Sequence, residues 1–256
     1  HEYYPSFVRT TMPKIVWRIV RVLYEVLPRK SNAIIIVNDC FKRFFKGYKH
    51  TVTIIYAPLS SEVHRTRRKE KKSFFKVFYY GGLSRDRGVM DLIASILDLP
   101  EVKLIIAGKG ELKETIVMLS KKYGNLNYLG WVTEEEISSL TSSSDLIPIL
   151  YNPAIINNKW AAPNKLFLAM AMGIPVIVCK GTLMEKIIED ERCGISVKYG
   201  VVDEIKKAIL ALQNNEDLYR ELSRNGVKAF NEKYSWGTVE KRLVSLYESL
   251  TMKDRN

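Results

Sequence analysis

An amide and a basic side chain stand at the start of one helix-forming segment. Asn164 and Lys165 follow Pro163, which suits the first turn of a helix because its missing N–H needs no partner there. The free backbone N–H groups of a first turn attract anions, and an adjacent lysine adds positive charge. The segment therefore predicts an anion site, with an ordinary helix carrying a surface lysine as the alternative.

A buried strand is expected directly after this helix. Gly173 marks the end of the helix, since glycine readily adopts the left-handed conformation that closes one. Residues 174–178 form a short apolar and mostly β-branched run, which is typical of a strand covered on both faces. The anion site is thus expected on a helix that packs against a sheet.

Short apolar strands alternate with amphipathic helices from residue 74 onward. We expect strands at 75–80, 102–107, 126–129, 146–150, 174–179 and 194–197. We expect helices at 89–97, 112–122, 134–141, 163–172, 184–189, 202–213, 217–232 and 238–250. This alternation predicts an α/β fold with a doubly wound, Rossmann-like parallel sheet, whose ligands bind at the carboxyl ends of the strands.

Positive charge is concentrated in the first part of the chain. Residues 1–72 hold 16 Lys and Arg against 5 Asp and Glu, whereas residues 73–256 hold 24 against 23. Such asymmetry favours an anionic partner: nucleic acid, a phospholipid surface or a phosphorylated acceptor. The three cysteines show no metal or redox spacing, which indicates reduced thiols in the cytoplasm. No apolar run is long enough to predict a transmembrane helix.

The first 60 residues follow a different pattern. Residues 14–27 are mostly apolar, with their polar side chains on one narrow stripe of a helix at Lys14, Arg18, Arg21 and Glu25. Residues 33–37 and 52–56 resemble strands. A helix that joins an apolar face to arginines suits an anionic membrane surface, while burial in the rest of a domain is the alternative.

Five segments, taken in order, resemble the group 1 glycosyltransferases, a family with the GT-B fold. They read YGGLSRDRG at 80–88, IIAGKG at 105–110, YLGWV at 128–132, SDL at 144–146 and APNKLFLAMAMGIPVIV at 162–178. In the family these correspond to the first phosphate loop, a Gly-x-Gly turn, the base-binding segment, a step into the next strand and the donor-binding helix. The resemblance runs from about residue 74 to residue 250.

The resemblance also implies a domain organisation. Residues 1–60 would be the remnant of an incomplete amino-terminal, acceptor-side domain, followed by a basic linker at 61–73. Residues 74–235 would form the nucleotide-sugar donor-binding domain, and residues 236–256 a helix that crosses back to the amino-terminal domain. His1 and its neighbours resemble a piece from midway through that first domain, so we expect roughly a hundred upstream residues to be missing.

Members of the family move a sugar from a nucleotide-diphosphate donor to an acceptor, usually with retention and without an essential metal; we expect no cofactor. Because charge builds up on the leaving diphosphate, fixed cations must stabilise it where no metal does. The resemblance makes Arg87 and Lys165 these cations, with a solvated loop as the alternative for Arg85 and Arg87. His1 aligns with a histidine near the reacting centre.

Further positions are implied to bind the donor. These are Gly81, Gly82, Arg85, Gly108, Gly110, Val132, Asn164 and Leu168. Gly82 takes the place of a frequent arginine, which Arg85 could replace. Gly108 and Gly110 let the backbone approach a ligand, although their string is not the G-x-G-x-x-G dinucleotide fingerprint. Val132 would offer main-chain hydrogen bonds to the base.

Two departures from the family put catalysis in question. Family members carry two glutamates eight positions apart, which touch the donor sugar and hold its ribose; here Trp160 and Leu168 replace them. Leucine cannot accept hydrogen bonds from a ribose. Asn157 and Asn158 offer amides for hydroxyl recognition. Two interpretations follow: a glycosyltransferase that is weak or inactive as this chain alone, or a non-catalytic scaffold or regulatory subunit.

The expected partners are a nucleotide-diphosphate sugar and an acceptor, which is a sugar, a lipid-linked sugar or a protein. The basic opening adds an anionic membrane surface at the cytoplasmic face. The basic run at 65–72 raises nucleic-acid binding as a further hypothesis, but no aromatic residues interleave it, and nucleic acid is the less favoured partner. A nucleotide-sugar epimerase stays open as well, since a fold does not determine a reaction.

Overall fold

A computed structural model describes residues 12–45, 48, 51–53 and 74–253. The predictions for His1, for the linker at 61–73 and for the basic run at 65–72 lie outside these residues.

Two three-stranded parallel sheets form the centre of the carboxyl-terminal part. The first has the order β3 (Phe75–Tyr80), β4 (Val102–Ala107), β5 (Leu126–Gly130), and the second β6 (Ile147–Ile149), β7 (Val176–Cys179), β8 (Gly194–Val197). A parallel bridge between Val77 and Leu146 joins β3 to the start of β6. All strands are parallel, and the combined order β5-β4-β3-β6-β7-β8 is that of a doubly wound sheet. Successive strands are added on one side of β3 up to β5 and on its other side from β6 onward, so the strand order reverses between β3 and β6.

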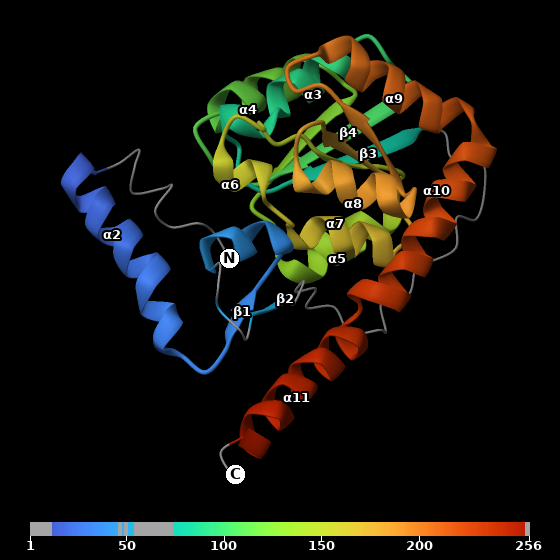
Figure 1. The fold of residues 1–256 in the computed structure, drawn as a ribbon. Coiled ribbons are helices and arrows are strands. Elements are labelled where there is room, and N and C mark those ends of the chain that lie inside the picture. Colours follow the sequence, from blue (N-terminus) through green and yellow to red (C-terminus); the bar gives the residue numbers. More distant parts are fainter. Residues whose placement is uncertain (1–11, 46–47, 49–50, 54–73, 254–256) are drawn as a thin grey trace.

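Helices cover both faces of this arrangement (Figure 1). The longer helical elements of this part are α3 (Val89–Ile96), α4 (Lys113–Lys122), α5 (Glu134–Ser143), α6 (Ile156–Lys159), α7 (Asn164–Ala171), α8 (Leu183–Glu191), α9 (Val202–Asn214), α10 (Glu216–Ala229), the π-helix η4 (Phe230–Tyr234) and α11 (Trp236–Lys253). The predicted α/β fold with parallel strands is confirmed. Among the described residues, no helix combines the length and the apolar character needed to cross a membrane.

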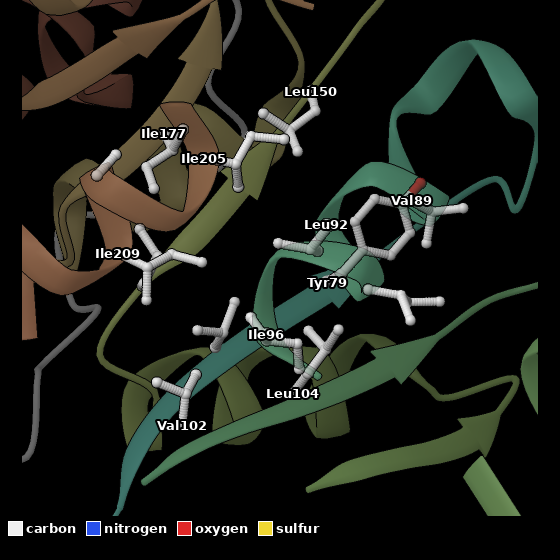
Figure 2. Packing of buried hydrophobic residues seen from close by; sticks show 14 of the residues in the cluster. Tyr79, Val89, Leu92, Ile96, Val102, Leu104, Leu150, Ile177, Ile205 and Ile209 are labelled. Atoms are coloured by element: carbon white, nitrogen blue, oxygen red, sulfur yellow. The ribbon is translucent and has the colours of Figure 1, made fainter. Parts of the chain in front are cut away.

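Two apolar clusters hold the sheet between its helices. Neighbouring side chains of a strand point to opposite faces, so Val77 belongs to one cluster and Phe78 to the other. The first cluster packs α3 and α9 on the sheet, and Leu92 of α3 and Ile209 of α9 are among its members (Figure 2). The second packs α7, including Phe167, on the other face. Together they fix the strand ends that carry the candidate site.

The amino-terminal part is smaller and looser. It contains α2 (Lys14–Val26), η1 (Leu27–Lys30), β1 (Ile34–Ile36), the 3-10 helix η2 (Asp39–Phe45) and β2 (Thr51–Thr53), with β1 and β2 paired in parallel. Only Ile34, Ile36, Phe41 and Phe45 form the buried core of its described residues. α2 has no buried residue and stands away from the sheet (Figure 1).

The structure corrects several predicted boundaries. Two short helices were not predicted: α6, in the segment before α7, and η2, at residues 39–45. Helices this short lack the periodic apolar pattern that reveals longer ones. The helix expected at 217–232 ends at Ala229 and continues as the π-helix η4. Pro163 is the extended N-cap of α7 rather than its first helical residue, while Gly173 has the predicted positive φ, 62°.

α11 begins at Trp236 against η4 and then extends beyond the body of the domain (Figure 1). Its return to an amino-terminal domain stays a prediction, as do the proposed domain boundaries.

Candidate functional site

The loop after β3 lies directly against the loop after β4. The N–H of Gly81 donates to the carbonyl of Ala107 at 3.0 Å, and the N–H of Leu83 donates to Lys109 at 2.8 Å. At Gly108, where φ is +145°, an added Cβ would lie 1.9 Å from the carbonyl oxygen of Gly81. The close approach of two backbones therefore requires glycine there, before any ligand is considered.

Gly110 and Gly82 differ in whether the neighbouring backbone leaves room for a side chain. A Cβ on Gly110 would lie 2.4 Å from the carbonyl oxygen of Leu83, whereas a Cβ on Gly82 would meet nothing within 4 Å. Packing thus requires the glycine at 110 and not the one at 82. The expected contacts of both with a donor stay predictions.

Lys165 is buried in the first turn of α7 and is 9% exposed. Its Nζ donates to the carbonyl oxygen of Tyr80 at the end of β3 and lies 4.7 Å from the centroid of the Tyr80 ring. A Cβ on Gly81 would come within 2.9 Å of the same Nζ, so the glycine leaves room for the lysine. The alternative of a surface lysine is wrong.

Arg87 ends the short 3-10 helix η3 (Arg85–Arg87) that follows β3. Its guanidinium carbon lies 4.0 Å from the ring centroid of Tyr151, which follows β6, and its Nε lies 3.4 Å from Oδ2 of Asp86. The Arg87 side chain is 27% exposed, and its role as a donor cation stays a prediction. The structure brings the two expected cations to the same Tyr151 ring, at the carboxyl ends of β3 and β6 where the strand order reverses. Ligands of open α/β sheets usually bind in a crevice at this position.

Burial and charge repulsion lower the pKa of Lys165 to about 7. Burial is the larger cause, because a desolvated ammonium is unfavourable, and the positive charge of Arg87 adds to it. An anion bound beside both groups would relieve the repulsion and restore the charged lysine. The crevice is therefore suited to a diphosphate.

Asp86 is a site residue that sequence reasoning missed. Its Oδ1 accepts from the Ser84 hydroxyl at 2.5 Å and its Oδ2 from the Asn158 amide at 2.8 Å. Burial alone would raise the pKa of Asp86, but these hydrogen bonds and the charge of Arg87 outweigh it, so the pKa lies below its ordinary value. The available signal was an acidic residue placed between two arginines in a loop.

Two other predicted residues, Arg85 and Asn164, have exposed side chains. The Arg85 N–H donates to Glu111 at 3.1 Å and its carbonyl accepts from Tyr199 at 2.7 Å, while its side chain is exposed. Asn164 is the first residue of α7 and is exposed. Arg85 as a replacement cation and Asn164 as a donor ligand stay predictions.

Val132 and Leu168 are each 8% exposed and belong to the apolar cluster that packs α7 on the sheet. Leu168 is thus a packing residue of the core. That Leu168 lies close to the donor ribose stays a prediction. The main-chain hydrogen bonds of Val132 to a base also stay a prediction.

The proposed use of Asn158 in hydroxyl recognition is wrong. Asn158 is 2% exposed, and its amide is bonded to Asp86. Trp160, at the position of the first family glutamate, packs edge-on against Phe41 and Phe44 of η2, with ring centroids 6.1 and 5.6 Å away. Trp160 therefore packs the carboxyl-terminal part of the chain against its amino-terminal part.

Metal ligands and thiols are the remaining candidate groups. The described part of the chain contains no group of three or more His, Cys, Asp or Glu positioned to hold a metal. Cys40, Cys179 and Cys193 are free thiols, and burial raises the pKa of Cys179 and of Cys193 to about 12. Neither buried thiol is an activated nucleophile.

Comparisons with known proteins identify the family. The sequence pattern described as glycosyl transferases group 1 matches residues 60–229. This chain belongs to the group 1 glycosyltransferases. It is 30% identical over 182 residues to the uncharacterized glycosyltransferase MJ1607 of Methanocaldococcus jannaschii, and this match covers 67% of the chain and 44% of MJ1607. The chain thus spans less than half the length of that relative.

Solved structures of GT-B glycosyltransferases share the fold of this group 1 glycosyltransferase. Sucrose-phosphate synthase from Thermosynechococcus elongatus superposes with a TM-score of 0.73 at 16% identity, over 92% of this chain and 62% of the synthase. Anabaena HepE, solved in complex with UDP and glucose, superposes with a TM-score of 0.71 at 16% identity, over 91% of this chain and 67% of HepE.

Proposed function

We propose that this group 1 glycosyltransferase moves a sugar from a nucleoside-diphosphate sugar to an acceptor. The observation that carries the proposal is that Arg87 and the buried Lys165 lie beside the same Tyr151 ring, with its centroid 4.0 Å from the guanidinium carbon of Arg87 and 5.9 Å from Nζ of Lys165. Two fixed cations in a site of low solvent access stabilise the charge that develops on a leaving diphosphate. The first turn of α7 adds backbone N–H groups beside them.

We propose a uridine diphosphate sugar as the donor class, since HepE was solved with UDP and glucose in complex. Retention of configuration is proposed on the family resemblance. Metal independence is proposed because Arg87 and Lys165 supply the positive charge that a metal would otherwise bring. The acceptor class is a sugar, a lipid-linked sugar or a protein.

A non-catalytic role is the second candidate, because Leu168 fills the position of the ribose-binding glutamate and lies in the core. Such a relative would keep the fold and bind the nucleotide without transferring the sugar. Measuring UDP-glucose turnover together with UDP binding tests the two functions: turnover in the presence of a candidate acceptor excludes the scaffold, and the absence of UDP binding contradicts both.

The donor site is tested by titrating UDP into the protein in a calorimeter. Arg87→Ala and Lys165→Ala should each weaken UDP binding by about 1–3 kcal/mol, the range for charge-assisted hydrogen bonds. Lys207→Ala removes an exposed lysine on α9 and is the matched control, which should bind as the unmodified protein does. Unchanged affinity in both site variants would remove the proposed site.

We also propose that α2 rests on an anionic lipid surface at the cytoplasmic face of a membrane. Ile15, Ile19 and Val22 of α2 are exposed, and Lys14 and Arg18 lie on the same exposed helix. Apolar side chains beside basic ones complement the two layers of a lipid interface.

A further inference from the structure

The short helix α6 joins the two parts of the chain. Asn158 and Trp160 lie two residues apart, at its last turn and its C-cap. Asn158 contacts the phosphate-side loop after β3, and Trp160 contacts η2 in the amino-terminal part. Through α6, the contact of Trp160 with η2 is thus placed to set the position of Asn158.

On the amino-terminal side, Trp160 is held by polar and aromatic contacts. Its carbonyl oxygen accepts a hydrogen bond from the Asn38 amide at 2.9 Å, and both residues are buried. The Arg43 guanidinium lies 3.7 Å from the centroid of the indole ring, and Phe44 packs against its edge. A buried hydrogen bond and an aromatic pocket leave the end of α6 little freedom.

On the crevice side, Asn158 fixes one oxygen of Asp86 while Ser84 fixes the other. Asp86 Oδ2 is shared between the Asn158 amide and the Nε of Arg87, 3.4 Å away. With both carboxylate oxygens held in this way, Asp86 contacts only Nε of Arg87 and forms no two-bonded pair in the guanidinium plane, while the guanidinium stacks on Tyr151. Without Asn158, a closer carboxylate–guanidinium pair would draw Arg87 away from Tyr151.

We propose that Asn158 is a positioning residue for Arg87, acting through Asp86, and that the packing of Trp160 on η2 sets where Asn158 lies. This inference rests on the proposed diphosphate site. It assigns to α6, a segment that carries neither family glutamate, the task of keeping Arg87 directed toward the ligand. The amino-terminal part would then influence donor affinity without contacting the donor.

A double-mutant cycle on UDP affinity tests the inference. Asn158→Ala should weaken UDP binding about tenfold in the unmodified background and have little further effect in the Arg87→Ala background, because the residue it positions is then absent. Trp160→Ala perturbs the same path from its other end and should show the same pattern. Lys159→Ala removes an exposed side chain from the same helix and should leave UDP affinity unchanged.

The outcomes separate this inference from the proposed function. If the unmodified protein does not bind UDP, the proposed donor fails. If it binds UDP and Asn158→Ala binds equally well, or if the losses from Asn158→Ala and Arg87→Ala simply add, the positioning role is overturned. Circular dichroism melting establishes that each variant is folded, and Trp160→Phe, which keeps an aromatic ring against η2, replaces Trp160→Ala if that variant unfolds.

Discussion

At the scale of single residues, Lys165 combines a positive charge with burial. Its pKa is lowered from 10.5 to about 7, chiefly by burial and then by Arg87. Between these two values the unfolded chain binds a proton that the folded chain has released. Folding stability therefore increases as the pH rises from about 7 toward 10.5 on account of this residue.

We predict that Lys165→Met reduces this pH dependence, because methionine keeps much of the side-chain volume and carries no proton. The free energy of unfolding from urea titrations at pH 7 and pH 9.5 measures it. The unmodified protein should gain more stability between the two pH values than the variant does. Equal gains would contradict the buried, proton-releasing lysine.

Leu168 provides the second residue-scale prediction. Leu168→Glu should lower the free energy of unfolding by roughly 2–4 kcal/mol, because it places a carboxylate in the apolar cluster around α7. Leu168→Met conserves the volume and should cost less than about 1.5 kcal/mol. Thermal melting and UDP titration of both variants are the measurements. A Leu168→Glu protein with an unchanged melting temperature and tighter UDP binding would place the ribose beside this position instead.

At the scale of elements, α2 exposes an apolar surface in the described part of the chain. Ile15 is 69% exposed and Ile19 is 56% exposed, and the helix has no buried residue. An apolar surface of this kind is stable in water only at a cost, and a partner that covers it is favoured. Arg21 pairs with Glu25 at 3.4 Å along the helix, while Lys14 and Arg18 add positive charge.

We predict that the protein floats with anionic vesicles and much less with neutral ones. Ile19→Glu should reduce recovery with anionic vesicles, since it adds a negative charge to the apolar face. Met118→Glu changes an equally exposed apolar residue on α4 and should have little effect. Negligible recovery with both kinds of vesicle would end the membrane proposal and favour a protein surface as the partner of α2.

At the scale of the whole molecule, stability is expected to be uneven. Among the described residues, the core of the amino-terminal part consists of four buried apolar side chains, whereas the sheet domain has two large clusters, one on each face. Local opening is easiest where few apolar contacts must break. The contacts of Trp160 with η2 tie the smaller part to the larger one.

We predict that backbone amides of β1 and η2 exchange with deuterium faster than those of β3 and β4. Trp160→Ala should accelerate exchange in η2 and β1 further and leave β4 unchanged, because only the tie between the two parts is lost. Exchange followed by mass spectrometry of peptides measures both effects. Uniform protection along the described chain would contradict this division.

The sequence by itself determined the alternation of strands and helices and the glycine that ends α7, whereas the choice of Arg87 and Lys165 as the cations came from the family resemblance. Apolar periodicity, capping and charge are local properties, so they can be read from neighbouring residues. The family resemblance added the order of the loops, and the family match over residues 60–229 confirmed the membership. The short helices η2 and α6 were not predicted, because they are too short to show the apolar periodicity of a helix.

Only the tertiary structure decided what these residues contact. It buried Lys165 against the carbonyl of Tyr80, joined Asp86 to Asn158, and turned Trp160 into a joint with η2. The partners in these contacts are separated by 85, 72 and more than a hundred positions along the chain. No local pattern encodes such pairs. The first two form when strands from distant parts of the sequence align and bring their end loops to the same edge, and the third forms where the amino-terminal part packs on the sheet domain.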